Sequence, residues 1–125
     1  MEKELNPNQL SPLNLAFIGD CVFSLMVREK LLRESNRPVN DLHKDSVKLV
    51  NASKQAEFID LLMPYLTETE IGIFKRGRNA HTVNSSKSST VEQYHKATGF
   101  EALFGFLYLK GDYARLKELF DIICK

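Results

Sequence analysis

The feature that most constrains the fold is an apolar stretch with a carboxylate at its centre. Residues 15–27 read LAFIGDCVFSLMV, and Asp20 directly follows Gly19 in the middle of that run. A Ser-Pro pair, which is typical of a helix start, precedes the stretch. We therefore predict a core helix over residues 12–33. Asp20 needs a partner in such a helix, because a buried carboxylate without one costs free energy.

A second apolar run carries a carboxylate in the same way. Residues 98–109 read TGFEALFGFLYL, with Gly105 one helical turn after Glu101. A glycine inside a helix is unfavourable unless packing requires it, and close approach of two helices is one such reason. If the two helices cross near their glycines, Asp20 and Glu101 point at one spot. Two carboxylates at one spot repel unless a proton or a cation joins them, and Mg²⁺ is the common cation with oxygen ligands.

The sequence pattern alone also allows a less specific role for each of the two acids. Asp20 also suits the N-cap of a helix that starts at Cys21, with the preceding glycine in a turn. Glu101 also suits a solvated position or a pair with a lysine.

The rest of the chain favours helices joined by short polar connections. We predict a helical region over about 39–62 that bends or divides at 51–53 and ends at Pro64. Capping-box spacings at TETE and TVEQ predict two more helix starts. The remaining expected helices cover about 68 to 76 or 78, 91–109 and 113–124. With no convincing strand alternation, the fold class is all-α: one helical-bundle domain over residues 1–125, of which 1–10 are expected to be loosely ordered.

Composition narrows the class of protein. The chain is 43% hydrophobic and 26% charged, and no apolar run reaches the ~20 residues of a membrane-spanning helix. The N-terminus lacks the basic start and apolar stretch of a secretory signal. Neither cysteine belongs to a CxxC pair, and we expect Cys21 to be a small core residue. These features favour a cytoplasmic protein.

Positive charge gathers in one segment. Residues 75–96 contain five basic residues and one acidic residue, although the whole chain carries a net charge of only +1. The part from about 79 to 90 is rich in Asn, Ser and Thr and is predicted to be a loop. Such a basic loop suits a polyanionic partner, and it equally suits solvated surface. The three histidines have no metal-motif spacing, and His81 is the only one that we place near a polyanion.

Taken together, these motifs resemble a known family. FIGD in the first apolar run and FEALFGFLYL in the second resemble the two signature helices of the ribonuclease III endonuclease domain. LNLAFIGD, NDLHK, SKQA, KRGRNA and YHKATGFEAL resemble its Mini-ribonuclease III branch. The resemblance covers about residues 13–119. We expect no separate double-stranded-RNA-binding domain after Lys125 of the kind that larger relatives carry, and the Mini branch lacks that domain too.

The resemblance implies an all-α homodimer that hydrolyses double-stranded RNA with Mg²⁺. Asp20 and Glu101 would hold the metal, and the products would have 5′-phosphate and 3′-hydroxyl ends. The Mini branch is associated with maturing both ends of the large-subunit (23S) ribosomal RNA precursor, and a ribosomal protein is a candidate partner. The residues expected to contact RNA are Lys75, Arg76, Arg78, Asn79, His81, Ser85, Ser86 and Lys87.

The sequence departs from the larger relatives at three supporting acids. Leu13 and Ala16 stand where those relatives have glutamates, and Thr98 stands where they have an aspartate. The resemblance therefore implies a metal held by fewer protein ligands, with the number of metal ions open. The alternative function is a non-catalytic helical RNA-binding or ribosome-assembly module, which has no need of two carboxylates in apolar helices.

Overall fold

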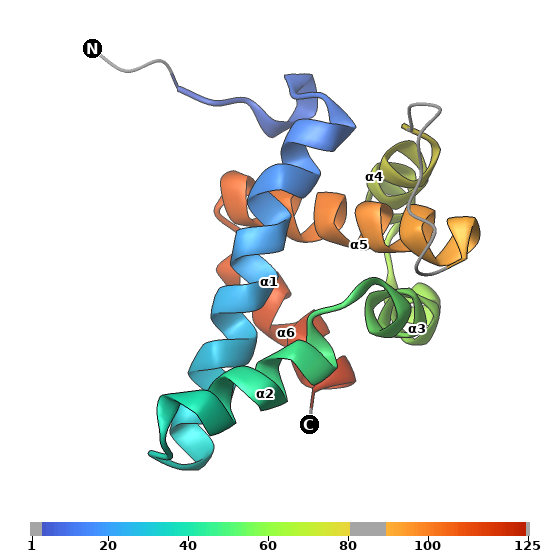
Figure 1. Ribbon diagram of the computed structural model, residues 1–125. Helices are drawn as coiled ribbons and strands as arrows, with labels where there is room; N and C mark the ends of the chain where they lie inside the picture. The colour runs from blue at the N-terminus through green and yellow to red at the C-terminus, as the bar shows by residue number, and fades with distance from the viewer. Residues whose placement is uncertain (1–3, 81–89, 125) are drawn as a thin grey trace.

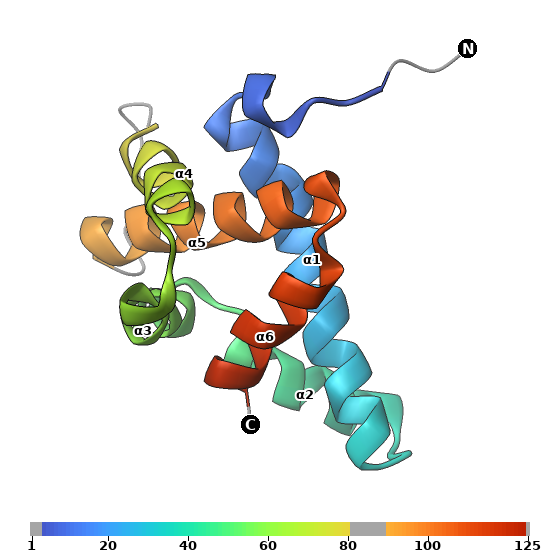
Figure 2. The same cartoon turned by 180° about the vertical axis from the view of Figure 1, so that it is seen from behind.

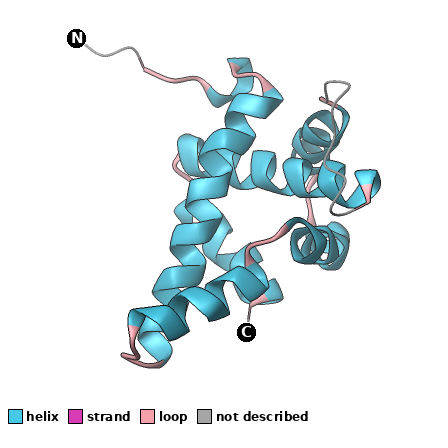
Figure 3. Ribbon diagram, viewed as in Figure 1, coloured by secondary structure: helices cyan, strands magenta, loops and turns pink. Residues whose placement is uncertain are grey.

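The computed structural model describes residues 4–80 and 90–124, and all regular structure in these ranges is helical (Figure 3). Two 3-10 helices accompany six α-helices. The elements are Pro7–Gln9, α1 (Pro12–Glu34), α2 (Val39–Leu49), α3 (Ala52–Leu62), Met63–Tyr65, α4 (Glu68–Asn79), α5 (Val91–Lys110) and α6 (Tyr113–Ile123). The all-α fold class is confirmed. Within the described ranges, no helix has the length and apolar character needed to cross a bilayer.

Helix α5 is the central element. It crosses α1 and lies between α4 on one side and α3 on the other (Figures 1 and 2). Its burial follows from its sequence, since nearly every residue from Ala97 to Leu107 is buried. Phenyl rings fill the space between the helices, and the Phe23 ring of α1 packs edge-on against Phe100 of α5 with centroids 4.9 Å apart. Any side chain on the inner faces of α1, α3 or α4 is therefore close to α5.

The helix ends follow the capping residues of the sequence. Both predicted capping boxes form, at Thr67 with Glu70 and at Thr90 with Gln93. Gly111 ends α5 in the left-handed conformation, with φ of 83°, which suits a residue without a side chain. The predicted region over 39–62 divides into two helices because of Asn51. Its side chain caps α3 by accepting from the Lys54 N–H, and it donates to carbonyl groups at the end of α2.

Three details differ from the sequence predictions. Helix α4 continues to Asn79, so this residue lies in the last turn of the helix and not in the loop predicted over 79–90. Cys21 is exposed, so its predicted place in the core is wrong: it lies on the outer face of α1. The N-terminal segment expected to be loosely ordered contains a 3-10 helix, and Pro7 within it is buried.

A partly buried ion pair joins α4 to α6. The Arg115 guanidinium donates to both carboxylate oxygens of Glu70, at 2.8 and 2.9 Å, and to the carbonyl oxygen of Tyr65 at 2.7 Å. Glu70 is also the acid of the capping box at the start of α4. This network fixes the start of α4 relative to α6 on the side of the bundle shown in Figure 2.

Candidate active site

The two apolar helices with carboxylates meet at their glycines. A Cβ atom at Gly19 of α1 would lie 1.6 Å from the carbonyl oxygen of Glu101, and one at Gly105 of α5 would lie 1.9 Å from the carbonyl oxygen of Leu15. No side chain fits at such distances, so the helix backbones touch directly. The predicted crossing at Gly19 and Gly105 is confirmed. It brings the segments that carry Asp20 and Glu101 together.

Asp20 and Glu101 lie side by side at this crossing. Asp20 is in the middle of α1 and exposed, which excludes the helix N-cap role, and Glu101 is half-buried. The pKa of Glu101 is raised to about 8, mainly by burial and also by Asp20, through like-charge repulsion and by accepting a hydrogen bond from protonated Glu101. Glu101 is therefore not fully solvated, and no lysine among residues 4–80 and 90–124 pairs with it. Near neutral pH, and without a cation, the pair holds a proton.

A third side chain reaches the pair from α3. Gln55 is buried, at 4% exposure, and its side chain acts on Glu101 by lowering the pKa of that carboxyl against the larger effects of burial and Asp20. Gln55 belongs to the SKQA motif, and the sequence alone predicted no role for it. The available signal was its position on the apolar stripe of α3, four residues before Ile59.

The chemistry of these side chains fits a hard divalent cation. Carboxylate oxygens are preferred ligands of Mg²⁺, and a cation between the two acids removes their mutual repulsion. Residues 4–80 and 90–124 contain no group of three or more His, Cys, Asp or Glu side chains arranged to hold a metal. The three positions where larger relatives have acids carry no carboxylate here: Leu13 is partly exposed, whereas Ala16 and Thr98 are buried, and the Thr98 hydroxyl donates to the Tyr94 carbonyl. Among the described residues, Asp20 and Glu101 are therefore the two carboxylates that could hold such a cation.

The expected RNA contacts divide into two groups. Lys75, Arg76 and Asn79 are exposed at the end of α4, and the Arg78 guanidinium lies over the Phe74 ring, 5.5 Å from its centroid. The other expected contacts lie outside the described residues: His81, Ser85, Ser86 and Lys87.

The basic end of α4 and the carboxylates lie on different sides of α5. Helix α4 touches α5 where a Cβ at Gly77 would be 2.9 Å from the Cα of Gly99. Gly99 is two residues before Glu101, and two residues turn an α-helix by about 200°, so the two project from opposite faces. Helix α5 thus lies between the described basic residues of α4 and the carboxylates.

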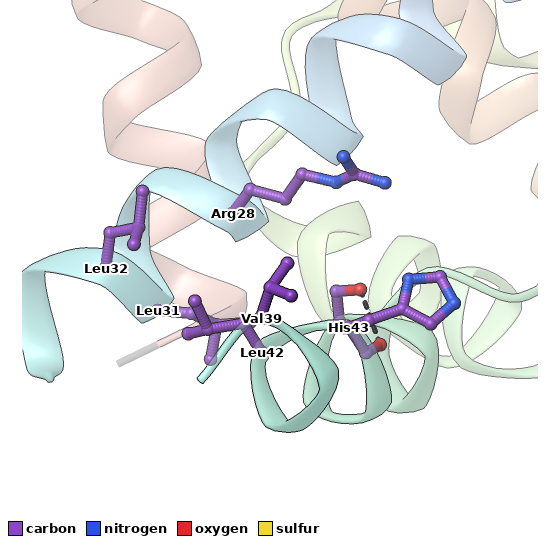
Figure 4. A pocket seen from close by; sticks show the side chains of 7 residues that line it. Arg28, Leu31, Leu32, Val39, Leu42 and His43 are labelled. Carbon is purple, nitrogen blue, oxygen red and sulfur yellow. Dashed lines mark hydrogen bonds between the residues drawn. The ribbon is translucent and has the colours of Figure 1, made fainter. Parts of the chain in front are cut away.

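A separate hollow lies between α1 and α2. It has a volume of about 260 Å³, contains neither Asp20 nor Glu101, and is lined by Leu31, Leu32, Val39, Leu42, Ser46 and two basic side chains, Arg28 and His43. Figure 4 shows the guanidinium of Arg28 extending from α1 over His43 of α2. His43 belongs to the NDLHK motif, so this part of the resemblance lies away from the carboxylate pair.

Comparisons with known proteins agree with this architecture. Residues 13–112 match the family described as Ribonuclease III domain. The chain is 49% identical over 113 residues to a Mini-ribonuclease 3 of Thermoanaerobacter sp. (strain X514), covering 90% of this chain and 80% of that protein. It is 39% identical to a Mini-ribonuclease 3 of Staphylococcus aureus (strain NCTC 8325 / PS 47), covering 91% and 87%.

A solved structure extends the comparison to the fold. The crystal structure of a Fusobacterium nucleatum protein superposes with a TM-score of 0.83 at 31% identity, covering 92% of each chain. The sequence match includes both signature helices and the glycine crossing between them. The chain therefore belongs to the ribonuclease III family, in its Mini-ribonuclease 3 branch.

Proposed function

We propose that this chain is a magnesium-dependent endoribonuclease that hydrolyses double-stranded RNA in the cytoplasm. The observation that carries the proposal is the carboxylate pair of Asp20 and Glu101, held together by direct backbone contact of α1 and α5. Membership of the ribonuclease III family supports the same reaction class. The expected products carry 5′-phosphate and 3′-hydroxyl ends.

The two acids have different environments, which suits complementary roles. Exposed Asp20 faces the solvent from which RNA would arrive, whereas half-buried Glu101 is held against α1 and α3. Both would hold Mg²⁺, and Glu101 must give up its proton for that purpose. A bound Mg²⁺ supplies the Lewis acid that activates water and neutralises charge on the phosphodiester. The rigid glycine crossing holds the acids in place, so little reorganisation is needed when the substrate binds.

RNA affinity is proposed to come from the end of α4 and the segment that follows it. The exposed Lys75 and Arg76 would contact phosphates, and Asn79 would contact a 2′-hydroxyl. His81, Ser85, Ser86 and Lys87 are proposed to extend the same surface. Because these contacts are largely electrostatic, binding is expected to weaken steeply with salt.

We also propose a homodimer, formed through an exposed apolar face. Phe17, Cys21 and Leu25 follow one another at helical spacing on α1, and Phe17 and Leu25 are 75% and 66% exposed. Tyr108 and Tyr113 continue this face, beside a groove of about 350 Å³. We call these five residues the apolar α1 face. Apolar area of this extent typically marks an interaction site, and a dimer would let each protomer cut one strand.

The proposed substrate is the large-subunit (23S) ribosomal RNA precursor, of which the enzyme would mature both ends. A ribosomal protein that shapes this RNA is the candidate partner. Resemblance to the Mini branch is the basis for both proposals.

Cleavage of a synthetic RNA duplex tests the proposed activity. Wild type is expected to cut it with Mg²⁺ and not with EDTA, and Asp20→Asn is expected to lose about 10³-fold or more in rate, because one of the two ligand carboxylates is gone. The matched control is Asp41→Asn, which changes an exposed acid on α2 and should cut at the wild-type rate. Equal survival of the duplex with wild type and Asp20→Asn would favour the non-catalytic RNA-binding alternative.

A further inference from the structure

Gln55 has a buried polar group that the bundle itself does not need. Its Nε2 is fully buried and makes no hydrogen bond to any of the residues that the structure describes. A buried N–H donor without a partner costs free energy, and most buried side-chain polar atoms have one. The unpaired amide is therefore either a packing defect of α3 or a donor that has a role other than stabilising the bundle.

The position of Gln55 on α3 favours another purpose. It continues the stripe of Phe58, Ile59 and Leu62, each buried against the core, where an apolar side chain of similar length would pack without an unpaired donor. Helix α3 packs on α5, and the Gln55 side chain lies within interacting distance of the carboxyl of Glu101 there.

We propose that Gln55 is a positioning residue whose Nε2 donates a hydrogen bond to the ionised Glu101 carboxylate and so orients that carboxylate toward a cation shared with Asp20. This inference rests on the proposed function, since it concerns the same carboxylate pair. It adds a residue from a third helix, which holds a proposed metal ligand without itself touching the metal. Partners of this kind typically change metal affinity about 10- to 100-fold when removed.

The test replaces Gln55 by apolar side chains of similar volume, Gln55→Met and Gln55→Leu. Mg²⁺ affinity is measured by titration calorimetry without RNA, and the melting temperature is measured in EDTA. Both variants are expected to bind Mg²⁺ about 10-fold more weakly than wild type. Their metal-free melting temperature is expected to stay equal or to rise by about 3 °C, because the unpaired donor is gone.

A matched control removes another buried polar group. Ser46→Ala deletes a buried hydroxyl on α2 that donates to the His43 carbonyl in the same helix, and it should leave Mg²⁺ affinity unchanged. The Gln55 inference is overturned if both apolar variants bind Mg²⁺ within about two-fold of wild type. Failure of the wild type itself to bind Mg²⁺ and to cut duplex RNA overturns the proposed function instead.

Discussion

At the scale of single residues, the ionised form of Glu101 is unfavourable in the metal-free fold. Burial and the neighbouring Asp20 both disfavour its ionised form, and the Gln55 amide opposes them only in part. A side chain chosen for stability alone would be apolar here, as are Ala102, Leu103 and Phe104 beside it. The carboxylate therefore has a cost in the metal-free protein that a bound cation removes.

The unfavourable ionisation of Glu101 predicts a pH dependence of the protein's stability. The folded-state pKa of Glu101 is raised from 4.5 to about 8, so its contribution is fully present below pH 4.5 and is lost as the pH rises through 8. In EDTA, the melting temperature of wild type should fall from pH 5 to pH 8 more than that of Glu101→Gln. Differential scanning fluorimetry across this range is the measurement.

The control for this prediction is Glu57→Gln, which changes an exposed acid on α3 and should follow the wild-type curve. Parallel curves for wild type and Glu101→Gln would show that Glu101 ionises normally in the folded protein and would contradict the assigned environment.

At the scale of elements, two glycine contacts on different faces of α5 place it among its neighbours. Gly105 meets Gly19 of α1, and Gly99 meets Gly77 of α4. Because no side chain separates the backbones, the helices have little freedom to slide. The first contact fixes the carboxylate pair, and the second fixes the basic end of α4.

We expect Gly19→Ala to destabilise the protein strongly. Its Cβ would lie 1.6 Å from the Glu101 carbonyl oxygen, so α1 and α5 must separate, at a cost of about 3 kcal/mol or more. Urea denaturation measures the change, and Mg²⁺ affinity should fall with it. The matched control is Gly72→Ala in α4, where the new Cβ meets nothing within 4 Å and should stabilise the helix by about 1 kcal/mol. Similar stabilities of the two variants would mean that the crossing is not tight.

The sequence predicted the elements better than their contacts. Helix ends were predictable because caps are local: Thr67 and Thr90 each meet a partner three residues away. The glycine crossing was predictable because each helix carries the same pairing of glycine and carboxylate. The ion pair of Glu70 with Arg115 was not predictable, since 45 residues separate its partners.

The sequence predicted the two acids of the candidate site, but it did not predict the side chain from α3 that reaches Glu101. Asp20 and Glu101 stand out because a charge in an apolar run is conspicuous. Gln55 does not, because an uncharged amide in an amphipathic helix is ordinary until its burial is known. The prediction for Cys21 failed because a continuous apolar run gives no indication of which face turns outward, and that face is exposed here.

At the scale of the whole molecule, the apolar α1 face and the basic end of α4 are distinct surfaces. The first combines Phe17 and Leu25 with tyrosines at the end of α5 and the start of α6, and the second lies across α5. Separate surfaces allow a dimer to form without covering the basic residues. This arrangement suits a two-fold dimer that contacts one duplex with both protomers.

The dimer is predicted to depend on the apolar α1 face. Leu25→Glu places a charge in the proposed interface, where its desolvation is costly, and should sediment as a monomer at micromolar concentration. Leu61→Glu, an equally large change at an exposed leucine of α3, should sediment as a dimer like wild type. Analytical ultracentrifugation distinguishes the two. A monomeric wild type, or a dimeric Leu25→Glu variant, would rule out this interface.

RNA affinity is predicted to depend on salt through the end of α4. Replacing both Lys75 and Arg76 by Ala should reduce the slope of log affinity against log salt by about 2, since each phosphate contact contributes about 0.9. Fluorescence anisotropy in the Asp20→Asn background avoids cleavage. The matched control replaces Arg33 and Lys117 by Ala. Both are exposed, and each forms an ion pair within its own helix. An unchanged slope in the Lys75 and Arg76 variant would place the phosphate contacts elsewhere.

The proposed activity requires that Asp20 and Glu101 share a divalent cation at the glycine crossing. Crystals grown with Mn²⁺, which stands in for Mg²⁺ and scatters anomalously, would show such a cation. We expect an anomalous peak within about 2.5 Å of an oxygen of each carboxylate in wild type, and none there in Asp20→Asn. No peak at the pair under saturating Mn²⁺, or a peak held only by other residues, would contradict it.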